Sequence, residues 1–120
     1  MLKIFLTLAL TLLLIDAVYI FVFKDYFSRL FGNVQKTPLN IRWGGFITTY
    51  IVMAATLYYF GFVINMTSLD MFLLGLSIYG IYELTNYSTL SKWEFKMVML
   101  DTLWGGILFY LTHRISSSLF

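Results

Sequence analysis

Hydrophobic residues dominate four stretches of the chain, and each stretch is long enough to cross a bilayer as an α-helix. About 20 helical residues span the ~30 Å hydrocarbon layer. The stretches run from Leu2 to Phe23, from Trp43 to Ile64, from Ser68 to Leu90 and from Met97 to Ser117. The pattern predicts an all-α fold: residues 1–120 form one polytopic membrane domain, an antiparallel bundle of four transmembrane helices.

The longest connection, residues 24–42, has an amphipathic first half followed by residues typical of turns. Its apolar side chains recur at helical spacing beside charged ones: Tyr26, Phe27, Leu30 and Phe31 against Lys24, Asp25 and Arg29. Gly32, Asn33 and Pro38 follow. This predicts a short interfacial helix in the first loop, lying on the membrane surface, and then a turn.

Composition supports a membrane protein. Hydrophobic residues make up 60% of the chain and charged residues 12%, whereas soluble domains have about 25% charged residues. The chain has no cysteine, which excludes disulfides and thiolate metal sites. The basic residues are scattered rather than clustered, so nucleic acid is not an expected partner. The expected partner is the lipid bilayer, and a homo-oligomer or a larger membrane complex stays open.

The distribution of basic residues predicts the orientation. The first and third loops hold six of them, and the opposite side holds two: Lys24, Arg29, Lys36, Arg42, Lys92 and Lys96 against Lys3 and Arg114. Because cytoplasmic loops are enriched in Lys and Arg, we expect both termini on the non-cytoplasmic side. Trp43 and Trp93 would then lie at the cytoplasmic headgroup level, which amphipathic aromatic residues favour.

Three carboxylates fall inside the predicted spans: Asp16, Glu83 and Asp101. Each charge near the bilayer centre costs about 2.5–3.5 kcal/mol on insertion scales, so we expect all three to face the bundle interior. Counted from the helix ends, all three lie roughly 7 to 10 Å below the cytoplasmic edge. They are therefore expected to form a single acidic layer.

Other polar residues share the faces of these carboxylates. On the third helix Tyr79 and Asn86 lie on the face of Glu83, and on the fourth helix Trp104 lies on the face of Asp101. Tyr82 is a further candidate donor. Arg42, at the start of the second helix, either reaches the layer as a counter-ion or extends to lipid phosphate. These residues are the candidates for binding an ion or another ligand.

Two further features have simpler interpretations. Gly75, Gly80, Gly105 and Gly106 are expected to allow close helix packing. His113 lies far along the fourth helix from the acidic layer, and we expect a surface or interface histidine there.

The polar segments also resemble a known family. They comprise the run YGIYELTN from Tyr79 to Asn86, Thr89 with Leu90, Trp93, and the run DTLWG from Asp101 to Gly105, preceded by Asp16 in the first helix. Over essentially the whole chain the sequence resembles the predicted bacterial membrane proteins grouped as domain of unknown function 2177. The resemblance implies that the polar layer has a function, and that an aspartate is usual where this chain has Glu83.

Three classes of function fit these residues. The first is binding or translocation of a proton, a cation or a polar lipid headgroup by the acidic layer. The second is a membrane-embedded enzyme that modifies lipid, with a carboxylate as base and Tyr79 or Tyr82 as donor. The third is a structural subunit of a larger membrane complex. No motif identifies a cofactor or a metal, and the choice between an enzyme and a binding protein stays open.

Overall fold

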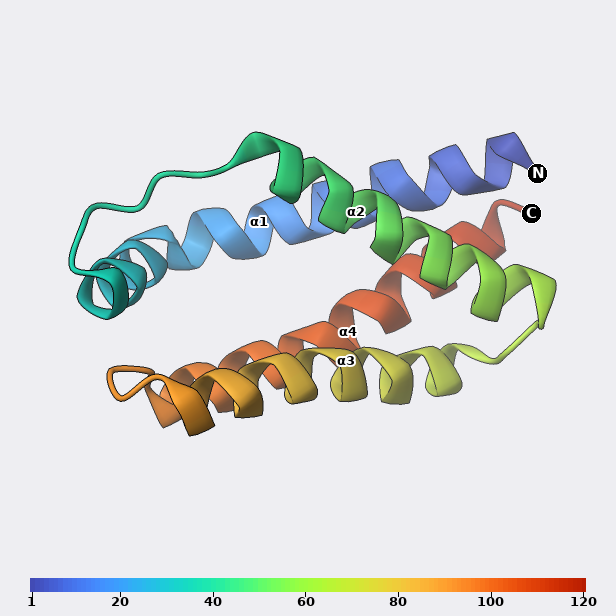
Figure 1. The fold of residues 1–120 in the computed structure, drawn as a ribbon. Helices are drawn as coiled ribbons and strands as arrows, with labels where there is room; N and C mark the ends of the chain where they lie inside the picture. Colours follow the sequence, from blue (N-terminus) through green and yellow to red (C-terminus); the bar gives the residue numbers. More distant parts are fainter.

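The computed structural model describes residues 1–120 and contains four α-helices and no strand, as the sequence predicts. The helices are α1 (Leu2–Gln35), α2 (Trp43–Tyr58), α3 (Ser68–Thr89) and α4 (Phe95–Ser118), and a π-helical turn, η1 (Tyr59–Val63), continues α2. The two chain termini lie at one end, and the α1–α2 and α3–α4 connections lie at the other (Figure 1).

The prediction of a separate interfacial helix in the first loop is wrong, because α1 continues without interruption for 34 residues. Its last turns bend away from the line of the rest (Figure 1). Phe27 and Leu30 pack against Trp93 and Met97, so the apolar side of this segment contacts protein rather than the membrane surface. The helix ends at Lys36, whose left-handed backbone (φ 59°) directs its N–H to the Gly32 carbonyl.

The buried side of each helix follows helical periodicity. On α1 the buried residues recur every three or four positions for most of its length: Leu8, Leu12, Asp16, Tyr19, Phe27 and Leu30. The core consists of two clusters. One, around Leu12, Leu57 and Phe109, joins all four helices, and the other lies near the α3–α4 loop. Asp16 lies in the same stripe as the core leucines, so the fold buries this acid.

Glycines bring α3 and α4 close together, as the sequence predicts. A Cβ atom on Gly75 would collide with the Gly105 carbonyl oxygen and lie 2.9 Å from Cβ of Phe109. A Cβ atom on Gly106 would lie 2.8 Å from Cγ of Leu76. Any side chain at these positions would push the two helices apart, so α3 and α4 form a tightly packed hairpin.

The first two helices are packed differently. α2 packs against α1, and η1 is the part of this helix that reaches α3. Leu2–Gln35 and Trp43–Val63 are both long and apolar enough to cross a membrane. α3 and α4 have 22 and 24 residues, which is sufficient length for a span, but they carry more polar side chains. The gap between α2 and α3 exposes the polar interior.

Candidate functional site

Asp16 is held by two hydrogen bonds from two other helices. Its side chain is 6% exposed and comes from the middle of α1. The Tyr50 hydroxyl of α2 donates to Oδ2, and Nε1 of Trp104 on α4 donates to Oδ1 at 2.8 Å. Both carboxylate oxygens therefore have a donor, which fixes the orientation of this carboxylate.

Asp101 is bound on one oxygen only. The Tyr19 hydroxyl donates to its Oδ1 at 2.9 Å, and the carboxylate is 8% exposed. The Tyr19 ring stacks on Trp104 with 4.5 Å between centroids and 9° between planes. Because Trp104 binds Asp16 while Tyr19 binds Asp101, this stacked pair links the two acids. Oδ2 of Asp101 accepts no hydrogen bond from a tyrosine or tryptophan, and the Glu83 carboxyl group lies within hydrogen-bonding reach of Asp101.

Glu83 is fully buried, and the Trp93 indole provides its only donor. Nε1 of Trp93 donates to Oε1 at 2.9 Å, whereas Oε2 is buried without a partner. The charged neighbour acting on Glu83 is another acid, Asp101. Trp93 was expected at the headgroup level, but it is 4% exposed and points inward from the α3–α4 loop. The headgroup-level depth of Trp93 stays a prediction, and Glu83 gives its indole N–H a buried acceptor.

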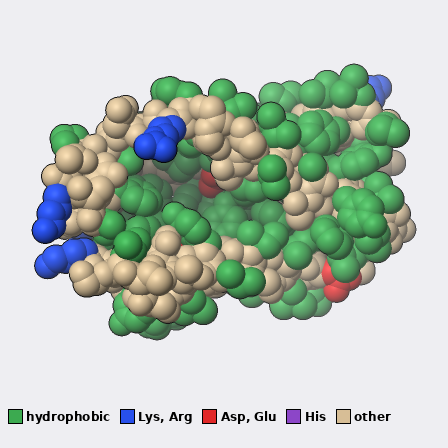
Figure 2. Space-filling model, in the orientation of Figure 1, with side chains coloured by type: hydrophobic (Ala, Val, Ile, Leu, Met, Phe, Trp, Pro, Cys, Tyr) green, Lys and Arg blue, Asp and Glu red, His purple; other side chains and the backbone are tan.

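Two connected hollows lead from the surface to these acids. One, of about 550 Å³, lies between α2 and α3 and is lined by Thr48, Thr49, Val52, Met53, Ile78, Tyr79, Tyr82 and Asp101. The other, of about 490 Å³, shares Tyr79, Tyr82 and Asp101 and extends past Asp16 to Lys24. We call the two together the lateral cleft. Figure 2 shows acidic atoms at the bottom of this hollow, with hydrophobic side chains around it.

The remaining candidates lie at different distances from the acids. Tyr79 and Tyr82 line the lateral cleft beside Asp101. Asn86 is half-buried and makes no hydrogen bond to a carboxylate. Arg42 is exposed at the start of α2 and contacts none of the three acids. No group of three or more acidic or histidine side chains is arranged to hold a metal ion. The acids thus lie near one another without a basic partner.

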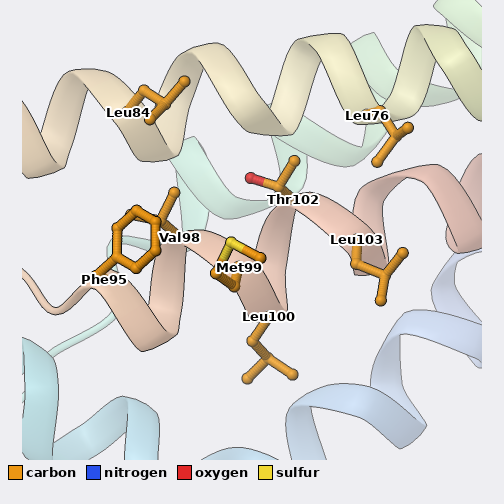
Figure 3. Close-up of a pocket in the computed structure, with 8 residues that line it drawn as sticks. All are labelled: Leu76, Leu84, Phe95, Val98, Met99, Leu100, Thr102 and Leu103. Atoms are coloured by element: carbon orange, nitrogen blue, oxygen red, sulfur yellow. The ribbon is translucent and has the colours of Figure 1, made fainter.

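A further groove follows the outer face of the α3–α4 hairpin. It has a volume of about 580 Å³ and is lined by seven apolar residues and Thr102 (Figure 3). None of its lining residues is charged, and none of the three acids lines it. Its surface suits acyl chains and offers no candidate chemistry.

His113 is buried, so the expected surface or interface histidine was wrong. Its Nδ1 lies 2.7 Å from Oγ of Ser68, and its Nε2 lies 3.3 Å from the carbonyl oxygen of Gly61 in η1. Gly61 has no side chain, and a Cβ atom there would lie 2.6 Å from the imidazole ring. The histidine therefore links η1, α3 and α4 at the end of the molecule where the termini lie.

Comparison with known proteins identifies the family. The family described as Predicted membrane protein (DUF2177) matches residues 1–117. The chain belongs to this family. The resemblance read from the YGIYELTN and DTLWG segments is thereby confirmed, and no curated protein or solved structure matches the chain. For this DUF2177 protein, the family description implies a lipid-bilayer context.

Sequence reasoning on the DUF2177 chain missed three donors. Tyr50 and Tyr19 hold Asp16 and Asp101, and Trp93 holds Glu83. Tyr19 lies one turn after Asp16 on α1, but its partner is Asp101, 82 residues away. No local signal distinguishes Tyr50 from the other tyrosines, because its role depends on how α1 and α2 pack. The burial of all three carboxylates, in contrast, was predicted correctly.

Proposed function

We propose that this membrane protein binds the polar headgroup of a membrane amphiphile, which enters sideways through the lateral cleft and ends at Asp101. One observation carries the proposal: a largely apolar cleft between α2 and α3 ends on a carboxylate that accepts one hydrogen bond from a tyrosine and has no basic partner. A buried charge without a counter-ion is costly unless a ligand or a proton compensates it. A ligand that approaches through lipid needs an apolar body and a polar end, and the cleft offers surfaces for both.

Among the alternatives in the first class, a headgroup is better supported than a metal cation. The three acids are not arranged as a metal site, and two oxygens of Asp16 are already hydrogen-bonded. The volume of about 550 Å³ falls in the range of small-molecule sites.

We further propose that all four helices cross the bilayer and that both termini lie on the non-cytoplasmic side. A cysteine introduced at Lys3 or at Lys92 and labelled from outside intact cells tests that orientation.

Native mass spectrometry of protein released from nanodiscs of a mixed polar lipid extract tests the binding function. We expect the wild type to retain a lipid that Asp101→Asn loses. Asp25→Asn is the matched control, because it makes the same change at an exposed residue that makes no hydrogen bond and does not line the cleft. Adducts that are absent from the wild type, or equal in all three proteins, contradict the proposal.

A further inference from the structure

The hydroxyl groups on the α2 wall of the lateral cleft act as acceptors toward a ligand. The hydroxyls of Thr48 and Thr49 donate to the carbonyl oxygens of Gly44 and Gly45, at 2.7 and 2.9 Å. A hydroxyl has one proton, so what each threonine offers the cleft is a lone pair. The wall formed by α2 therefore cannot donate a hydrogen bond to a ligand without losing one of its own.

The donors at the floor of the cleft are used in the same way. The Tyr19 hydroxyl is bound to Asp101, the Tyr50 hydroxyl to Asp16, and the Trp104 indole to Asp16. The backbone N–H groups of the walls belong to helices and are bonded there. A carboxylate can accept about four hydrogen bonds, and Asp101 accepts one from these donors, so acceptor capacity is left over. The donors of a ligand can therefore bind Asp101, while the hydroxyls of Tyr79 and Tyr82 also line the cleft.

Aromatic rings beside Asp101 favour a ligand with a positive charge. Tyr79 and Tyr82 line both hollows of the lateral cleft beside Asp101. The face of an aromatic ring attracts a cation within about 6 Å, and the carboxylate adds attraction of the same sign. Asp101 is the charged group that acts on both Asp16 and Glu83, and no basic side chain forms an ion pair with any of the three acids.

Resting on the proposed headgroup-binding function, we infer that the lateral cleft selects an amphiphile with a protonated primary amine, whose ammonium group binds Asp101 between Tyr79 and Tyr82. A primary ammonium brings three donors to the open acceptor sites of Asp101, and a positive charge to an acid without a counter-ion. A trimethylammonium headgroup has the charge but no donor. A phosphate has no positive charge to offer Asp101. Lys24, the one basic residue of the cleft, lies about 12 Å along α1 from Asp16.

Four probes with the same dodecyl tail separate the effects of charge and of hydrogen-bond donors: dodecylamine, dodecyltrimethylammonium, dodecanol and dodecyl phosphate. Each is added at equal amount to phosphatidylcholine nanodiscs, and native mass spectrometry measures the fraction of released protein that carries the probe. We expect dodecylamine to be retained at least about tenfold more than the other three, as hydrogen bonds between charged groups imply.

Two pairs of variants locate the site. Asp101→Asn should reduce dodecylamine retention about tenfold and Asp25→Asn should not. Thr48→Trp fills the cleft from an exposed position on α2 without touching the acids, and Ala55→Trp makes the same addition at an exposed α2 residue that does not line the cleft. Loss of retention in Thr48→Trp alone supports the site even if Asp101→Asn does not fold.

The other outcomes are distinct. Retention of dodecanol equal to that of dodecylamine overturns the requirement for charge, and preference for dodecyl phosphate or dodecyltrimethylammonium overturns the amine altogether. If such retention still depends on Asp101 and on an open cleft, the proposed headgroup-binding function stands. Retention of no probe, together with no lipid adduct from the mixed extract, overturns both proposals.

Discussion

Substituting Gly75 by alanine tests the close approach of α3 and α4. A Cβ atom there would collide with the Gly105 carbonyl oxygen and come within 2.9 Å of Cβ of Phe109. Carbon atoms in contact normally lie about 3.5–4.0 Å apart, so the helices must separate by close to 1 Å. Forcing one extra methyl group into a packed core typically costs about 1–3 kcal/mol. That is roughly a 5- to 150-fold change in the folding equilibrium.

Gly45→Ala is the matched control, because no atom lies within 4 Å of a Cβ built at Gly45. Alanine is the better helix former, by up to about 1 kcal/mol, so the control should be neutral or slightly stabilising. Unfolding of both variants in mixed micelles by increasing SDS, followed by tryptophan fluorescence and circular dichroism, measures the difference. Equal stability of Gly75→Ala and Gly45→Ala would refute the reasoning, because a methyl group at Gly75 would then fit without separating the helices.

Three further substitutions test the polar contacts. Trp93→Phe removes the only donor to the buried Glu83 and should cost about 1–3 kcal/mol in the same SDS assay, whereas Trp43→Phe, at a 62% exposed position without a hydrogen bond, should change stability by less than about 0.5 kcal/mol. Because Oε2 of Glu83 is buried without a donor, we predict a protonated carboxyl group there at pH 7, seen as an infrared carbonyl band that Glu83→Gln removes; a wild-type spectrum without the band contradicts this. Thr67→Ala breaks the capping box at the start of α3 and should destabilise the protein by about 1 kcal/mol, and no change would mean that lipid headgroups or water replace the cap.

The hydrophobic pattern was sufficient to predict where the helices lie. Three of the four predicted spans begin and end within a few residues of the helices in the structure, because a run of apolar residues leaves the backbone few alternatives in lipid. The pattern failed after Phe23. Amphipathic residues there suit the membrane surface and a protein partner equally well, and only the position of Trp93 and Met97 decides between them.

The candidate site was predictable in its acids and unpredictable in its donors. Asp16 and Asp101 continue the buried stripes of their helices, so helical spacing alone directs them inward. Tyr50 meets Asp16 across 34 residues, and that pairing depends on the rotation of α2 about its axis. The openness of the cleft was also invisible, because the sequence does not tell which pairs of helices stay apart.

The position of Trp93 has a consequence for how protons move. Its buried ring lies between Glu83 and the α3–α4 loop, within a cluster of aromatic and aliphatic side chains that includes Phe27, Leu30 and Met97. This cluster insulates Glu83 from water at that end of the molecule. The neighbouring acid Asp101, which borders the cleft, then provides the route for exchange with the surroundings. If a cation binds at Asp101 as we propose, it closes this route, and occupancy of the cleft then controls how quickly the innermost carboxyl group equilibrates with bulk pH.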